Sequence, residues 1–530
     1  MAITKVTGAL LGNYTGGSAD DTVVVGDGAG DAITTGVDNT LIGDNAGTAL
    51  TEGSKNVAIG NEALAAEDTR GSSVAIGYRS LTAQNTGAEA YNVAVGVDAA
   101  LGLTTATSLT AVGAFAGGGG TLTGADNTLV GRNAGYVLTS GTNNTFIGSL
   151  SGDVTTTASN NTAVGYSSLS ANTTGTENSA VGSGALKTNT TGNYNTALGY
   201  ECLRLSTTSQ ENTAVGYYAL GANTTGAKNT AMGAASLDAN TTGSNNSAFG
   251  REALTKTTTG SHNTGLGYES LKENTTASEN TAVGYQSLKL ATTAYECTAV
   301  GASAGYNITT GYSNTCIGKN AGDQLTTGTH NVMVGHNSGS HNANVTTGGD
   351  NVFIGNFASG SAAAAARQIA LGYGAQCVQN DAITIGISSN TATLLLNGSD
   401  ESWDANSDER LKENIQDSSA GLSFVNDLRP VTFNWKKAKD VPSDMAEYIE
   451  GSEEPAMGHE YGVTYHGFIA QEVKKTIDKH PEIKDGFGMW RESDSGTQRV
   501  AKGSVVTMLV KAIQELSAKI EELEAQINGE

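Results

Sequence analysis

The sequence predicts a mainly β protein: a trimeric parallel β-solenoid (β-roll) with 17-residue repeats, followed by a small α+β domain that ends in a coiled-coil helix. Three observations lead to this fold class. A five-residue motif that ends in glycine recurs along most of the chain. All four prolines lie within the last 124 residues, after the repeats have ended. The final segment carries apolar residues at heptad spacing, which is typical of a helix that packs against copies of itself.

Composition separates the same two parts of the chain. Of 530 residues, 70 are glycine and 6% are aromatic, so most of the chain lacks the large apolar residues of an ordinary core. Residues 1–406 contain 14 Lys and Arg against 29 Asp and Glu, whereas the much shorter remainder contains 15 against 23. We therefore predict an N-terminal cap or attachment segment, a repeat shaft, a linker and a separate domain, at 1–37, 38–390, 391–406 and 407–530.

Charge and cysteine usage exclude several classes of function. A net charge of −23 argues against binding to a nucleic-acid backbone. No apolar run is long enough for a signal peptide or a membrane span, so we expect folding in a cytosol and no membrane insertion. We expect no cofactor. The cysteines lie far apart without Cys-x-x-Cys spacing, which favours buried thiols over disulfides or a metal site; they are Cys202, Cys297, Cys316 and Cys377.

The repeat motif is Asn-Thr/Ser/Val-Ala-Val/Ile-Gly. Twelve successive steps of 17 residues carry its glycine from Gly131 to Gly335, and less regular steps extend it from Gly43 to Gly386. In the unit 161–175 we expect a short strand, a bend at Gly165, a second short strand and an Asn-Thr-Thr-Gly turn. Stacked units rise about 4.8 Å each, so twenty steps predict a rod roughly 100 Å long.

The strand alternation predicts two different faces. Val164 and its equivalents share one face, which we expect to be buried with the leucines of the second run. Ala163 and Gly165 share the other face, which is small enough to admit another backbone. A lone coil would leave that face open, so the pattern favours a homotrimer over a monomeric solenoid.

The segments Lys55-Asn-Val-Ala-Ile-Gly60 and Ser72-Ser-Val-Ala-Ile-Gly77 resemble the β-roll head repeats of trimeric autotransporter adhesins, over roughly 38–390. The resemblance implies architecture only, and the longer repeat suggests that the Asn-Thr-Thr-Gly turn projects as a loop. Tyrosines recur at one repeat position, where stacking between rungs is favoured over glycan binding; they are Tyr166, Tyr200, Tyr217, Tyr268 and Tyr285.

Three motifs define the C-terminal domain: Ser407–Ile415, Gly421–Lys436 and His466–Val473. Together they resemble the intramolecular chaperone of endosialidase tailspikes, the peptidase S74 family. The resemblance implies self-cleavage of the bond between Asn406 and Ser407 by a serine–lysine dyad, with Ser407 as nucleophile and Lys412 as general base. It also implies an assisting role for His466. Two further candidates are weaker: Asp408, which either holds the dyad or caps a helix, and Glu472.

Elementary chemistry is consistent with that implied reaction. A serine hydroxyl needs a base, and a lysine serves only when burial or neighbours lower its pKa. Positions five apart on one helix point about 140° apart. We therefore expect Ser407 to lie just before a helix, with Lys412 reaching back to it or across to a neighbouring subunit.

The chain ends in a predicted coiled coil at about 504–528. Its apolar residues step by three and four, and they are Val506, Leu509, Ile513, Leu516, Ile520, Leu523 and Ile527. Bringing three such helices together would supply the nucleus for a shaft whose non-local β pairing is slow to form.

These features favour a structural virion appendage, similar to a bacteriophage tail fibre, that folds in the host cytoplasm. Its expected partners are two further copies of the chain, virion tail or capsid proteins at the N-terminus, and a host-surface glycan or protein. Two alternatives are a tailspike-type enzyme that degrades polysaccharide and a cellular surface adhesin that borrowed the chaperone domain. The repeats leave no room for a non-repetitive catalytic domain with clustered acids, which disfavours the enzyme.

Overall fold

The structure is a computed structural model that describes residues 21–388, 390–396, 404–405, 409, 412–443, 445, 447–456, 462–483, 488–492 and 498–529. The chain divides into two compact units, Met1–Asn406 and Ser407–Glu530. Among the described residues, no helix is long and apolar enough to cross a membrane.

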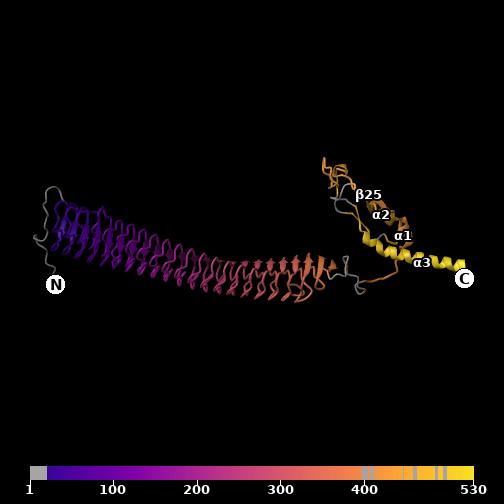
Figure 1. Cartoon of the computed structure of the whole chain (residues 1–530), viewed down its shortest axis with the longest axis horizontal. Coiled ribbons are helices and arrows are strands. Elements are labelled where there is room, and N and C mark those ends of the chain that lie inside the picture. Colours follow the sequence, from indigo (N-terminus) through magenta and orange to yellow (C-terminus); the bar gives the residue numbers. More distant parts are fainter. Residues whose placement is uncertain are drawn as a thin grey trace. The chain divides into compact units, whose positions relative to one another are not determined.

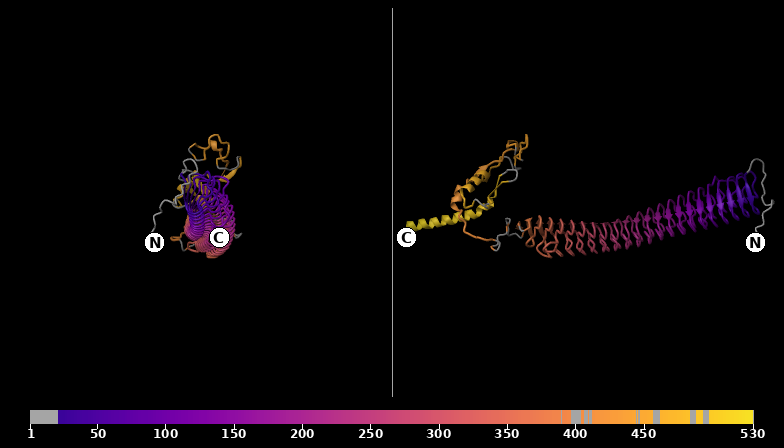
Figure 2. Two further views of the ribbon diagram at one scale, coloured as in Figure 1. Left: turned by 90° about the vertical axis from the view of Figure 1, so that its left-hand side faces the viewer. Right: turned by 180° about the vertical axis from the view of Figure 1, so that it is seen from behind.

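Unit 1 is a parallel β-solenoid, which confirms the predicted mainly β fold (Figure 1). Each of its first twenty strands has three residues and pairs in parallel with the strand of the next rung, as Ala163 of β9 does with Ala180 of β10. The left view of Figure 2 looks along this stack. The strands are β1 (Val23–Val25), β2 (Thr40–Ile42), β3 (Val57–Ile59), β4 (Val74–Ile76), β5 (Val93–Val95), β6 (Thr110–Val112), β7 (Thr128–Val130), β8 (Thr145–Ile147), β9 (Thr162–Val164), β10 (Ser179–Val181), β11 (Thr196–Leu198), β12 (Thr213–Val215), β13 (Thr230–Met232), β14 (Ser247–Phe249), β15 (Thr264–Leu266), β16 (Thr281–Val283), β17 (Thr298–Val300), β18 (Thr315–Ile317), β19 (Val332–Val334) and β20 (Val352–Ile354).

The bend and the second run of each rung are left-handed turns. Gly165 has φ +136°, and a Cβ there would lie 2.6 Å from the carbonyl oxygen of Gly182, so only glycine fits. The prediction of a second strand is wrong, because Ser167 and Leu169 both have positive φ, at +51° and +50°. Alternating left-handed residues curl the chain enough to close a short rung. The N–H of Leu169 still donates to the carbonyl of Ala185 in the next rung, at 3.0 Å.

The two strand faces are reversed relative to the prediction. Ala163 is fully buried in the core together with Leu169, whereas Val164 is only half-buried on the outside. The rung encloses a narrow interior that alanine and leucine fill, so the larger β-branched residues point outward. We call these residues the outer apolar row: the third residue of each of β1–β20, with Leu371 and Ile385. Many are 36–48% exposed: Ile42, Val112, Ile147, Val181, Leu198, Met232, Leu266, Val300, Ile317, Ile354 and Ile385.

Buried asparagines form a ladder through the shaft. The side-chain oxygen of Asn161 accepts from the backbone N–H of Asn178 at 3.0 Å, and its Nδ2 donates to the carbonyl of Gly175 at 3.0 Å. These bonds satisfy polar groups that burial would otherwise leave unpaired. The asparagine ladder consists of Asn39, Asn56, Asn92, Asn127, Asn144, Asn161, Asn178, Asn195, Asn212, Asn229, Asn246, Asn263, Asn280, Asn314, Asn331 and Asn351.

The Asn-Thr-Thr-Gly turn does not project as the sequence suggested. Asn172 is fully buried, and its Nδ2 donates to the carbonyl of Gly175 at 2.9 Å. Its Oδ1 accepts from Asn189 in the next rung at 2.9 Å. This second set of buried amides draws the turn into the wall of the rung.

Tyrosine stacking between rungs is confirmed for two pairs. The rings of Tyr200 and Tyr217 stack with centroids 5.6 Å apart, and those of Tyr268 and Tyr285 do the same at 5.6 Å. The four cysteines are buried free thiols, as predicted. Burial raises the pKa of Cys202 to about 11, which makes its thiol inert at neutral pH.

The C-terminal end of unit 1 changes pairing. Strand β21 (Gln368–Leu371) continues the parallel stack onto β22 (Ala382–Ile387). Strand β22 then pairs antiparallel with β23 (Asn390–Leu395), which pairs antiparallel with β24 (Asp404–Ala405). Part of the segment expected to be a linker is therefore β-structure.

Unit 2 is a small α+β fold. A buried cluster forms around Phe424 of α1, Val473 and Ile477 of α2, and Met508 of α3. Its elements are α1 (Leu422–Asp427), β25 (Val431–Phe433), the 3₁₀ helix η2 (Ala438–Asp440), β26 (Tyr465–Gly467), α2 (Ala470–Lys479), β27 (Trp490–Glu492), β28 (Gln498–Val500), the 3₁₀ helix η3 (Lys502–Val505) and α3 (Val506–Asn528).

Candidate functional site

The residues predicted for cleavage are only partly within the described structure. Asn406, Ser407 and Asp408 lie outside the described residues. Lys412 is exposed, and its backbone N–H donates to the carbonyl of Glu409 at 3.0 Å. The expected helix beginning just after Ser407 is not found at residues 412–420, which are irregular, and α1 begins only at Leu422. The glycine and the paired serines that precede α1 favour an extended approach to it.

The second and third motifs meet in a two-stranded sheet. His466 of β26 lies opposite Thr432 of β25, and its side chain is exposed. Beside it, the rings of Tyr465 and Phe433 stack with centroids 6.1 Å apart. The structure thus brings together two motifs that are well separated in the sequence, and it places His466 on their surface.

An ion pair joins the same two motifs. The Nε and Nη2 of Arg429 donate to the two carboxylate oxygens of Glu472, at 2.9 and 2.5 Å. The hydrogen bonds from Arg429 lower the pKa of Glu472, so this carboxylate is held ionised. Glu472, in the first turn of α2, is thus joined to the residue that precedes Pro430 by an exposed ion pair.

A buried histidine that the sequence reading missed links α1 to the end of α2. His480 hydrogen-bonds Glu482 through Nδ1 at 2.9 Å and Asp427 through Nε2 at 3.1 Å, and its ring meets the edge of Phe424. Burial alone would lower the pKa of His480, but these two carboxylates outweigh it and raise the pKa. No local pattern marks His480, because one of its partners lies 53 residues earlier.

One face of the final helix is anchored and the other is open. The carboxylate of Glu515 accepts from the backbone N–H of Leu422 at 2.8 Å, and Met508 and Ala512 are buried. The predicted heptad residues lie on other positions of the helix and are 41–81% exposed. We call them the heptad seam: Val506, Leu509, Ile513, Leu516, Ile520, Leu523 and Ile527.

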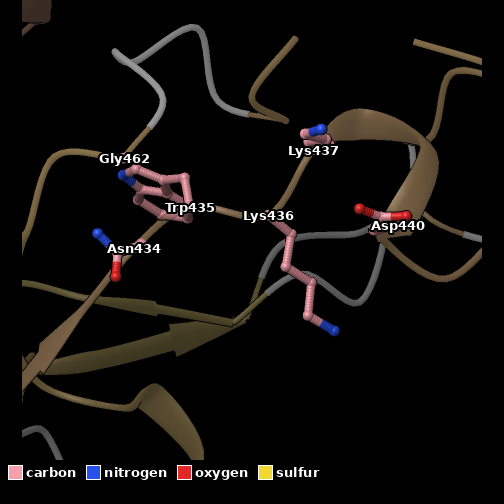
Figure 3. Close-up of a pocket in the computed structure, with 6 residues that line it drawn as sticks. All are labelled: Asn434, Trp435, Lys436, Lys437, Asp440 and Gly462. Carbon is pink, nitrogen blue, oxygen red and sulfur yellow. The ribbon is translucent and has the colours of Figure 1, made fainter. Parts of the chain in front are cut away.

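A pocket of about 320 Å³ lies beside β25 and η2. Figure 3 shows Asn434 and Trp435 on one side of it, and Lys437 and Asp440 on the other. Lys437 and Lys439 both bind Glu453, and these two bonds lower the pKa of Glu453 to about 2. None of the residues predicted for cleavage lines this pocket. Among the described side chains, no cluster of His, Cys, Asp or Glu is arranged to hold a metal ion.

Comparison with known proteins assigns the C-terminal part. Residues 407–480 match the family described as "Chaperone of endosialidase". The match supports a chaperone domain of this kind in the C-terminal unit, and that family implies an autoproteolytic chaperone. Comparisons with curated proteins and with solved structures gave no match. A β-solenoid shaft followed by such a domain fits a tail-fibre-like protein.

Proposed function

We propose that this protein is a homotrimeric virion appendage, similar to a phage tail fibre, whose C-terminal domain templates assembly of the shaft and then cleaves itself off. The exposed heptad seam on α3, which follows the matched residues within the same unit, carries this proposal. In it, residues 1–37 attach to tail or capsid proteins, and the shaft contacts a host-surface glycan or protein. The recurring tyrosines include Tyr166 and Tyr217, which are each 57% exposed, and they offer aromatic contacts for a host-surface glycan or protein.

The heptad seam is suited to other copies of the same helix. Its own unit already holds α3 through Glu515, Met508 and Ala512, so the seam is not needed for the monomer core. Burying seven such side chains would contribute on the order of 10 kcal/mol per chain before the entropy of association is subtracted. Three heptads alone make a marginal coil, and the anchored face compensates by fixing the helix before it meets its partners.

The outer apolar row supports a trimeric shaft for a different reason from the one the sequence suggested. Every rung from β1 to β22 contributes an apolar residue to this row, and the strand pairing places the residues in one line. A continuous exposed apolar line calls for a partner. A second copy has the same rung spacing, so its row matches along the whole length.

The proposed cleavage is an acyl shift followed by hydrolysis. The Oγ of Ser407 attacks the carbonyl carbon of Asn406 while the amine of Lys412 accepts the hydroxyl proton. The peptide C–N bond breaks, the Ser407 amine leaves with a proton, and an ester remains. Water then hydrolyses the ester, which releases the Asn406 carboxylate and regenerates the hydroxyl. Asp408 and His466 would orient these groups.

Timing follows from the exposure of Lys412. A lysine acts as a base near neutral pH only when it is desolvated, and the side chain of Lys412 is exposed in the single chain. In this proposal a neighbouring subunit covers it, so cleavage waits for assembly. That order is useful, because the template is removed only after the shaft has formed.

The intact mass of the assembled protein tests this proposal. The wild type is expected to give two fragments that meet at Asn406 and Ser407, and Ser407→Ala and Lys412→Ala are expected to stay at 53.8 kDa. Lys439→Ala removes a lysine from the same unit and should still be cleaved. A wild-type trimer that stays at full length would rule out cleavage, and a wild-type monomer would rule out the assembly role.

A further inference from the structure

The asparagine ladder has a direction. Both side-chain groups of each asparagine bond to backbone groups later in the chain: Nδ2 of Asn246 donates to the carbonyl of Gly260, fourteen residues on, at 2.8 Å, and its Oδ1 accepts from the N–H of Asn263 in the next rung at 3.0 Å. All sixteen members of the ladder repeat this arrangement, from Asn39 to Asn351. In several rungs Nδ2 also lies 3.2 Å from the Oδ1 of the preceding asparagine, but that bond is the longer one.

A partly built shaft therefore has two different ends. The end that faces the N-terminus presents a backbone C=O and a backbone N–H, such as those of Gly175 and Asn178, which together bind one carboxamide. The end that faces the C-terminus presents an asparagine side chain that has lost both of those partners. Backbone groups are held in place by their own rung, whereas a lone side chain samples several rotamers. The N-facing end is thus the preorganised template.

The two ends of the ladder are closed differently: at the N-terminal end the backbone N–H of Asn39 donates to the hydroxyl of Thr22, at 3.3 Å, in place of a carboxamide. After Asn351 its place is taken by Gln368, whose carboxamide bonds to Ser361 and Asn380 and not to a backbone N–H and C=O of the next rung. The Oε1 of Gln368 accepts from the N–H of Ser361 at 3.0 Å, and its Nε2 donates to Ser361 at 2.7 Å and to Asn380 at 2.9 Å. Its own backbone N–H donates to Asn351 at 3.0 Å, so it presents the template arrangement toward the rest of the shaft.

The same end contains the most local pairing in unit 1. Strands β22 and β23 have six residues each and form an antiparallel hairpin, with Ile387 opposite Asn390. The regular rungs have three-residue strands whose partners lie 17 residues away. Hairpins form before pairings that must close a longer loop. We call residues 368–395 the cap; within the described residues, the first rung at β1 has no counterpart of it.

We propose that the shaft folds vectorially: the cap forms first, and rungs then add one by one toward the N-terminus. Each incoming rung inserts its asparagine between a C=O and an N–H that are already fixed. One step rests on the proposed function, namely that the chaperone unit, which follows the cap in sequence, holds three caps together. The direction itself rests on the ladder and the cap alone.

Pulsed hydrogen exchange with mass spectrometry during refolding tests the direction. The full-length Ser407→Ala chain would be diluted from denaturant, labelled at increasing times and digested. Peptides from residues 332–395 are expected to gain protection first, those from 230–300 next and those from 40–130 last. Protection that starts at the N-terminus, or that rises equally along the shaft, would overturn the proposal.

A matched pair of ladder substitutions gives a second test. Asn331→Ala and Asn144→Ala remove the same forward bonds, to Gly348 and Asn351 in one rung and to Ala158 and Asn161 in the other. Asn331→Ala should slow the folding of residues 57–130 about tenfold. Asn144→Ala should leave the protection of residues 332–395 on the wild-type time course and mainly speed unfolding. The reverse pattern would contradict the inference.

If either variant fails to fold, the hydrogen-exchange experiment on the full-length Ser407→Ala chain still tests the direction of folding. The oligomeric mass, measured by light scattering on the same samples, separates this inference from the proposed function. If the protein is a monomer that folds from the cap toward the N-terminus, the folding direction holds and the proposed homotrimer is wrong. If it is a trimer whose rungs fold in another order, the homotrimer holds and the folding direction is wrong.

Discussion

Glu515 of α3 accepts a hydrogen bond from the backbone N–H of Leu422, at the first residue of α1, with a distance of 2.8 Å. The carboxylate thus lies where unpaired N–H groups and the helix dipole favour negative charge. A Cβ on Gly421 would lie 2.7 Å from the same carboxylate oxygens, so a larger residue there would push the Glu515 carboxylate aside. One contact between residues far apart in sequence therefore sets which side of α3 faces its own unit.

Removing this contact should loosen unit 2. Glu515→Ala leaves the first N–H of α1 without its acceptor, and Gly421→Ala pushes the carboxylate away, so each is expected to lower the free energy of unfolding by about 1–3 kcal/mol. Urea unfolding followed by the fluorescence of Trp435 and Trp490 would measure the change. Glu521→Ala, on an exposed position of the same helix, serves as the control and should change little. Equal stability of all three variants would argue against the contact.

The heptad seam should control assembly and not the stability of unit 2. Ile513→Asp and Leu516→Asp place charges in a coiled-coil interface while leaving Met508 and Ala512 buried. Light scattering is expected to show a shift from trimer to monomer, with loss of cleavage, and unfolding of unit 2 should remain close to wild type. Lys519→Ala lies off the seam and should leave the trimer intact. Trimers that persist in both seam variants would place the interface elsewhere.

Periodicity carried the sequence prediction furthest. Because every rung repeats the same pairing, the spacing of Gly131 to Gly335 predicted the stack and its register. The heptad predicted α3 to within two residues, since η3 occupies the first positions. Alternation shows which residues share a face but not which face is inside, and so the roles of Ala163 and Val164 were reversed.

Sequence periodicity could not predict contacts between residues that lie far apart in the chain. His480 gains its charge environment from Asp427 on another helix, and Leu169 adopts a left-handed conformation that its own side chain disfavours. Both depend on packing that appears only in the folded rung or unit. Ser407 and Asp408 stay predictions, because they lie outside the described residues.

His480 should make the stability of unit 2 depend on pH. Its pKa is raised in the folded state, so its contribution is fully present below the unfolded pKa of about 6.5 and is lost as pH rises through the folded pKa. The pKa of Glu482 is lowered, so its contribution is lost as pH falls below about 4.5. The imidazole ring of His480 is surrounded by Glu482, Asp427 and Phe424. Urea midpoints should therefore be highest near pH 5–6.5.

His480→Gln keeps a hydrogen-bonding side chain but cannot titrate. Its urea midpoint is expected to stay nearly flat between pH 6 and 9, where that of the wild type falls. His466→Gln, at an exposed position, serves as the matched control and should follow the wild-type curve. A wild-type midpoint that rises over this range would contradict the assignment.

The bend glycines should be irreplaceable in the regular rungs. Gly165→Ala combines a positive φ of +136° with a Cβ only 2.6 Å from the Gly182 carbonyl, so the rung below must shift. We expect a loss of several degrees in the thermal midpoint of the shaft, measured by circular dichroism. Gly87→Ala is the control, because its Cβ would meet nothing within 4 Å. Similar losses in both would mean that glycine content, rather than the bend, matters.

Substitutions in the outer apolar row should weaken association of the three shafts without unfolding the rungs. Met232 and Leu266 are 42% and 47% exposed in the single chain, so Met232→Asp and Leu266→Asp should leave each rung folded by circular dichroism. In the proposed trimer the same aspartates would meet like charges from two other copies, which destabilises packing of the three shafts. Disulfide cross-linking between copies, through cysteines introduced on rungs next to the substitutions, should then fail along the shaft. The heptad seam should still hold the C-termini of the three copies together. Ala231→Asp gives the contrasting case: Ala231 is fully buried, so this variant should prevent the rung from folding at all. If the Met232 and Leu266 variants cross-link as well as wild type, the shafts associate through another face.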